Sequence, residues 1–109
     1  RNNWYSGQIF EDDRYRVKQA SVLAARGRRA LFDYNPIRRN GADPARIYRR
    51  IAQGPLLDIF LLDERSYRGP NGSNRNRSLE PDSAFLGAAQ LSWLEKALAS
   101  SRAVWKVVA

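Results

Sequence analysis

The chain of 109 residues contains no cysteine and no histidine. Without cysteine there can be no disulfide, no thiolate metal site and no cysteine nucleophile within it. Without histidine the commonest general base and the commonest zinc ligand are also missing. Ser66, Ser73 and Ser92 therefore have no histidine to activate them, and a serine hydrolase is excluded. We expect no catalytic residue within this chain, so catalysis would need groups from outside it.

Long apolar runs are also missing. The longest stretch, Leu56 to Leu62, contains Asp58 and is far too short to cross a bilayer. No signal-peptide pattern opens the chain, and we expect no membrane partner. The apolar share of 43% still predicts a folded globular domain and not a disordered chain.

Arginine is abundant and gives most of the net charge of +8, since lysine occurs only as Lys18, Lys96 and Lys106. Basic surfaces attract phosphate groups, whether of nucleic acids, anionic lipids or small phosphoesters. The arginines are scattered along the chain and form no single basic run. We therefore expect most of them to be solvated or paired, and we expect no specific nucleic-acid partner.

Apolar periodicity predicts a first helix over residues 13–33, closed by Pro36. Asp12 or Asp13 is placed to cap its start, where a carboxylate suits the helix dipole. Together with Glu11 these residues could also be read as a metal cluster, but their place at a helix start favours capping.

Two strands are predicted next, over residues 47–52 and 56–62, and they most simply form an antiparallel hairpin. The second is almost continuously apolar, which predicts cover on both of its faces. A polar excursion follows over residues 64–84, and a loop of this length inside a compact domain is usually functional or mobile.

A second helix is predicted to start at Gly87, with Gln90 as the third residue of a weak capping box, and to end at Ser100. Residues 103–109 have strong strand character. Because the chain stops inside this apolar strand, we interpret it as a truncated piece of a larger domain.

The loop after the second strand carries the first candidate site. Arg65, Tyr67 and Arg68 follow the carboxyl end of a buried strand, where open α/β sheets place functional groups. Arginine guanidinium groups suit phosphate oxygens, so these three residues are candidates for substrate binding. The alternative, which we favour on the residues alone, is structural: Asp63 and Arg65 pair with neighbours to hold the strand end, while Tyr67 packs.

Asn2 and Asn3 are the second candidate, because amide oxygens can bind hard cations such as calcium. Most asparagines simply form turns or caps, so the pair alone is a weak indication of a metal site.

Several runs of sequence resemble the PhoD-like family of alkaline phosphatases and phosphodiesterases, in matching order and spacing across nearly the whole chain. The runs are Arg1–Trp4, Arg46–Arg50 with Gly54–Asp58, Leu62–Arg68, and Leu86–Gln90 with Trp93, Leu94 and Ala103–Ala109. The family's Asp-Asp-His-Glu run, which lies just upstream of the asparagine pair, and its downstream Gly-Asp-X-His run are both missing here. The resemblance therefore implies that residues 1–109 are part of one catalytic domain that is truncated at both ends.

The resemblance implies an α/β (α+β) fragment of a four-layer αββα metallophosphoesterase sandwich, here about two helices, a β-hairpin and a C-terminal strand. It further implies a binuclear metal centre, with calcium and iron as the metals and Asn2 or Asn3 as one ligand. Arg65, Tyr67 and Arg68 match the family's Asp-X-Arg-X-Tyr-Arg run, for which substrate positioning and a structural role both stay open.

The function so implied is metal-dependent hydrolysis of a phosphoester substrate by a periplasmic or secreted full-length parent, with the fragment alone inactive. One alternative is a non-catalytic basic domain that binds phosphate-containing partners such as nucleic acid. Another is an interaction domain that kept the fold and lost the metal motifs.

Overall fold

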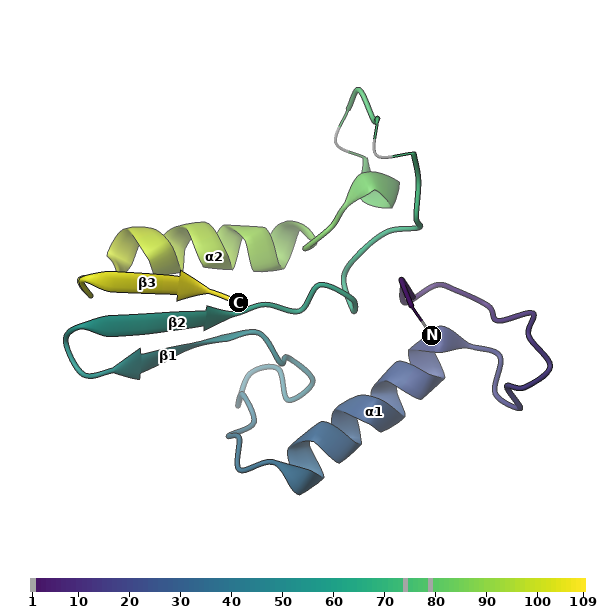
Figure 1. Ribbon diagram of the computed structural model, residues 1–109, viewed down its shortest axis with the longest axis horizontal. Helices are drawn as coiled ribbons and strands as arrows, with labels where there is room; N and C mark the ends of the chain where they lie inside the picture. The colour runs from purple at the N-terminus through teal and green to yellow at the C-terminus, as the bar shows by residue number, and fades with distance from the viewer. Residues whose placement is uncertain (1, 74, 79) are drawn as a thin grey trace.

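The computed structural model describes residues 2–73, 75–78 and 80–109, so Arg1 of the first resembling run lies outside the described residues. The elements, in chain order, are α1 (Ala20–Tyr34), β1 (Arg49–Gln53), β2 (Leu57–Leu61), the short 3₁₀ helix η1 (Pro81–Ser83), α2 (Ala88–Ser100) and β3 (Trp105–Val108). Two helices and a three-stranded sheet confirm the predicted α+β class (Figure 1). Neither helix in the described part of the chain is long and apolar enough to cross a membrane.

The sheet has the strand order β1-β2-β3. β1 and β2 are antiparallel, with Ile51 opposite Ile59, which confirms the predicted hairpin. Gly54 stands in the turn with a φ of 61°, a conformation that glycine adopts without steric cost. β3 pairs in parallel with β2, with Ile59 opposite Val107, because the chain crosses over through α2 before it returns to the sheet.

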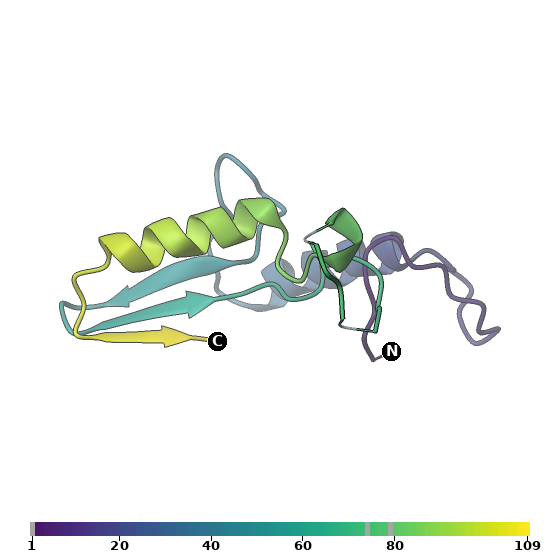
Figure 2. The ribbon, with the colours of Figure 1, turned by 90° about the horizontal axis from the view of Figure 1, so that it is seen from above.

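Helix α2 lies over one face of the sheet (Figure 2). On that face Phe60 is fully buried, and the Trp93 ring of α2 packs against it and against Tyr48, with ring centroids 6.5 and 4.9 Å away. Alternate residues of a strand point to opposite faces, and on the other face Ile59 is half-buried and Trp105 is 70% exposed. The prediction that β2 is covered on both faces is therefore wrong for the described residues.

A buried carboxylate fixes the hairpin to the end of α2. Asp58 is 1% exposed, its Oδ2 lies 2.6 Å from Nη2 of Arg50, and the hydroxyl of Ser101 donates a short hydrogen bond to it. The Ser101 hydroxyl, and then Arg50, hold the pKa of Asp58 below its ordinary value, against the opposing effect of burial. This polar group explains why an aspartate is tolerated within the apolar strand β2.

The first helix is shorter than predicted, since it starts at Ala20 and not at residue 13. Asp12 does not cap it: the Asp12 carboxylate accepts a hydrogen bond from the backbone N–H of Arg14 and lies 2.6 Å from the Arg14 guanidinium. Asp13 instead lies 3.2 Å from Nζ of Lys18. These local bonds form a turn in place of the predicted helical start, and competition of this kind is typical of aspartate. The predicted end of the helix before Pro36 is confirmed.

Candidate functional site

The candidate site is built on the turn that follows β2. Asp63 is 4% exposed, and its Oδ1 accepts hydrogen bonds from the backbone N–H groups of Arg65, at 3.0 Å, and Ser66, at 2.8 Å. A carboxylate that accepts two successive N–H groups holds the backbone in one turn conformation. Asp63 thus holds the strand end, as in the structural alternative, and leaves the side chain of Arg65 free to bind elsewhere.

Gln90 of α2 fixes the same strand end from the other side. Its side chain is 1% exposed, its Oε1 accepts the N–H of Asp63 at 2.7 Å, and its Nε2 donates to the Asp63 carbonyl and the Leu86 carbonyl, both at 2.9 Å. The predicted capping box is therefore wrong, because the Gln90 amide bonds to the Asp63 backbone and not to the N-cap of its own helix. Gly87 is the N-cap, as predicted.

Tyr67 is half-buried and packs against its neighbours. Its ring meets that of Tyr48 edge to face, with centroids 5.7 Å apart, and its Cβ would lie 2.9 Å from a Cβ at Gly87. Burial, and then the charges of Asp43 and Asp63, raise the pKa of Tyr67 above its ordinary value. The packing position of the Tyr67 ring corresponds to the structural alternative for this residue.

Arg65, Arg68 and Asn3 come together in one hydrogen-bonded group. Nη1 of Arg65 donates to Oδ1 of Asn3 at 3.3 Å, and Nδ2 of Asn71 donates to the backbone carbonyl of Asn3 at 2.7 Å. Nη2 of Arg68 donates to Oδ1 of Asn71 at 2.7 Å. Residues more than 60 positions apart in the sequence thus meet, and an expected metal ligand lies beside two expected phosphate-binding arginines.

The Arg68 guanidinium is fixed on a second side by Phe85, whose ring centroid is 5.2 Å from Cζ of the arginine. Nε of Arg68 is buried and has no hydrogen-bond partner among the described residues. Gly69, the next residue, comes so close to η1 that a Cβ there would lie 2.3 Å from the Asp82 carbonyl oxygen. The loop is therefore held in place on the side of η1 as well.

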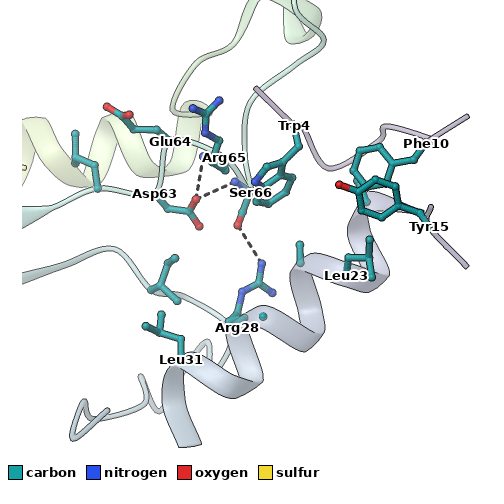
Figure 3. Close-up of a pocket in the computed structure, with 15 residues that line it drawn as sticks. Trp4, Phe10, Tyr15, Leu23, Arg28, Leu31, Asp63, Glu64, Arg65 and Ser66 are labelled. Atoms are coloured by element: carbon teal, nitrogen blue, oxygen red, sulfur yellow. Dashed lines mark hydrogen bonds between the residues drawn. The ribbon is translucent and has the colours of Figure 1, made fainter. Parts of the chain in front are cut away.

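A cavity of about 510 Å³ lies between α1 and this loop (Figure 3). On the polar side of the cavity, Nη2 of Arg28 donates a hydrogen bond of 3.1 Å to Oγ of Ser66. This bond joins α1 to the loop. The apolar lining of the cavity includes Trp4, Phe10, Tyr15, Leu23, Leu31, Ile47 and Leu62. Neither Arg28 nor Ser66 was predicted as part of the site. The sequence feature that could have indicated Arg28 is its helical spacing from Ala24 and Leu31, which places it on the apolar face of α1.

The comparison with known proteins decides the family. The family described as PhoD-like phosphatase matches over residues 1–109, which is the whole chain. The chain belongs to the PhoD-like phosphatase family. A solved structure described as "Structure of PhoD" is 29% identical, with a TM-score of 0.67 over 97% of this chain and 22% of that one. No protein with curated annotation matches significantly.

The resemblance inferred from the sequence runs is thereby confirmed. This PhoD-like phosphatase chain spans about a fifth of the length of the solved PhoD structure that it matches, and it takes up the corresponding α+β arrangement. The family is by its description one of phosphatases, which are hydrolases.

The described residues of this PhoD-like chain could supply only a small part of the ligands of a metal centre. They contain no group of three or more carboxylate, histidine or cysteine side chains that could hold a metal ion. Asn2 is exposed, and among the described residues its Oδ1 accepts one hydrogen bond, from the N–H of Asn3 at 3.1 Å, which leaves a second lone pair available. Asn3 has a left-handed φ of 51°, and its Oδ1 already accepts a hydrogen bond from Arg65. The pair therefore fits one neutral oxygen ligand, and the charged ligands must come from elsewhere.

Proposed function

We propose that the protein encoded by the complete gene hydrolyses phosphoesters with a binuclear metal centre, and that this chain supplies one amide ligand and two substrate-binding arginines. The observation that carries the proposal is the bond from Arg65 to Asn3, joined through Asn71 to Arg68. It sets an oxygen suited to a cation beside guanidinium groups suited to phosphate. Isolated from the rest of the protein, the chain is expected to be inactive.

The metals that we propose are calcium and iron, with Asn2 or Asn3 as a ligand. Such a centre, held in part by the Asn2 or Asn3 amide, would supply Lewis-acid chemistry and a bound water of lowered pKa. The residues of this chain act on the substrate in another way. Arg65 and Arg68 orient the phosphoryl group and offset its negative charge, since a guanidinium donates two parallel hydrogen bonds to phosphate oxygens.

The surrounding contacts give these arginines a fixed geometry. Asp63 and Gln90 fix the backbone that carries Arg65, and Phe85 holds the face of Arg68. Preorganised charges cost no rearrangement at the moment of reaction and are therefore worth more than mobile ones. We further propose that the complete protein acts in the periplasm or outside the cell.

The test uses the protein from the complete gene, with p-nitrophenyl phosphate and bis(p-nitrophenyl) phosphate as substrates. Hydrolysis of at least one is expected to stop on chelation and return with added calcium and iron. Arg65→Ala is expected to lower kcat/KM by tenfold or more, because a charge-assisted hydrogen bond contributes about 1.5–3 kcal/mol. The matched control is Arg26→Ala, which removes an exposed arginine of α1 outside the cavity lining.

Activity that is indifferent to the chelator would overturn the metal mechanism. Equal effects of Arg65→Ala and Arg26→Ala on kcat/KM would show that Arg65 does not bind the substrate. Saturable binding of phosphoesters without turnover, at any metal content, would favour the alternative of a non-catalytic basic domain.

A further inference from the structure

A second arginine-rich site lies away from the candidate site, at the edge of β1 that pairs with no strand among the described residues. It is a pocket of about 400 Å³ between that edge and the connection from α1, within the size range of small-molecule sites. Five arginines line it, namely Arg38, Arg39, Arg46, Arg49 and Arg50, and its lining includes no carboxylate. No part of the proposed hydrolysis uses these residues.

Two of the five arginines are neutralised by carboxylates outside the pocket. Arg50 is paired with the buried Asp58, and Nη2 of Arg39 lies 3.4 Å from the Asp33 carboxylate. The other three have no ion pair among the described residues. The pocket therefore carries an excess of positive charge, because no acidic side chain of its lining offsets the arginines.

Two of the three remaining guanidinium groups are held in place by neutral contacts. Arg49 donates from Nε to the Ile47 carbonyl at 2.9 Å and from Nη1 to the Arg38 carbonyl at 3.0 Å. Arg46 lies over the Tyr48 ring, with Cζ 5.0 Å from the ring centroid. These contacts restrict the side chains without neutralising them, which lowers the entropic cost of binding an anion.

Arg46 carries the most specific signal. Its Nε is buried and has no hydrogen-bond acceptor among the described residues. Asp43 is close in sequence and accepts the backbone N–H of Arg46 with its carbonyl, but its Oδ1 takes the N–H of Ala45, and no ion pair joins Asp43 to Arg46. Arg46 as a whole is half-buried, but a buried N–H without an acceptor is costly, so this atom calls for a partner.

The geometry points to a phosphate-binding site in this pocket, with Arg38, Arg46 and Arg49 as the binding residues, separate from the site of hydrolysis. Arginine matches the tetrahedral oxygens of phosphate bidentately, and Arg38 is an exposed lining residue whose guanidinium has no hydrogen bond or ion pair among the described residues. The phosphate group comes either from free orthophosphate or from a phosphodiester. The inference does not depend on hydrolysis, because it rests on a different set of residues.

The test is hydrogen exchange of the protein from the complete gene, with orthophosphate and dimethyl phosphate as two separate probes and acetate as a control for ionic strength. Protection of residues 36–50 by at least one phosphate probe is expected, and the probe that protects identifies the source. Arg46→Ala and Arg38→Ala are each expected to weaken the apparent affinity about tenfold or more. Arg26→Ala, with the same loss of charge, is expected to leave it unchanged.

Arg65→Ala separates this inference from the proposed hydrolysis, because protection of residues 36–50 is expected to survive in that variant even where activity is lost. Absence of protection by both probes would overturn the inference. So would protection that acetate reproduces, or that Arg46→Ala and Arg38→Ala leave intact. Circular dichroism of each variant checks that it is folded, and Arg38→Ala, at an exposed position, preserves the test if Arg46→Ala unfolds the protein.

Discussion

Replacing Gln90 by methionine tests how α2 and the strand end hold the candidate site. Methionine has a similar volume but no amide, so Gln90→Met deprives the backbone N–H and carbonyl of Asp63 of their partners. Both groups are buried, and a buried polar group without a partner costs about 1–3 kcal/mol. The expected loss of stability is therefore about 2–6 kcal/mol, a large part of the 5–15 kcal/mol by which a typical domain is stable.

Two measurements on the protein from the complete gene report this loss of stability. The midpoint of urea unfolding reports the overall effect, and hydrogen exchange of peptides over residues 60–68 reports the local one. A loss of 2 kcal/mol corresponds to about 30-fold faster exchange of the Asp63 amide. Gln53→Met is the matched control, because Gln53 is exposed at the end of β1 and is expected to change stability by less than about 0.5 kcal/mol.

The reasoning would be refuted if Gln90→Met and Gln53→Met had equal effects on the unfolding midpoint and on exchange. Gln90→Glu adds a sharper comparison, since a carboxylate still accepts from the Asp63 N–H but cannot donate to the Asp63 and Leu86 carbonyls. It also buries a charge, so we expect it to destabilise at least as much as the methionine variant.

Two further predictions concern the same region. Gly87→Ala places a Cβ 2.9 Å from that of Tyr67 at a φ of 75°, so we expect a loss of about 1–3 kcal/mol in unfolding free energy; a denaturation midpoint equal to that of the parent would contradict this. Asp58 has a lowered pKa in the folded state, so its stabilising effect is present above its ordinary value of 3.8 and is lost as the pH falls through the lowered value. Asp58→Asn is expected to remove this part of the acid dependence, as measured by thermal unfolding at a series of pH values, and an unchanged profile would refute the assignment.

The sequence predicts those elements whose own side chains carry the pattern. The alternation in 47–52, the apolar run in 56–62 and the apolar spacing after Gly87 gave β1, β2 and α2 within one or two residues, because each depends on local burial. The start of α1 could not be predicted in this way. The start of the helix depends on whether the Asp12 carboxylate caps a helix N-terminus or bonds to Arg14 in a turn. Either arrangement gives this carboxylate hydrogen-bond donors, so the sequence does not distinguish them.

The site was only partly predictable for a related reason. Asp63 and Arg65 stood out because they follow a strand predicted to be buried, but some of their partners lie far away in the sequence. Gln90 bonds across 27 positions and Arg28 across 38, and no local pattern records such contacts. Family resemblance supplied the phosphatase assignment, which the composition of this chain could not indicate.

The buried Asp58 group has a consequence for the evolution of the chain. Its three members come from β1, β2 and the end of α2, and only Asp58 is buried, so replacement of Arg50 or Ser101 leaves the buried carboxylate without one of its partners. Well-packed apolar replacements of a whole buried ion pair are often neutral, whereas the loss of one partner is not. Across relatives these three positions should therefore vary together, as a polar set or an apolar set, with mixed combinations selected against.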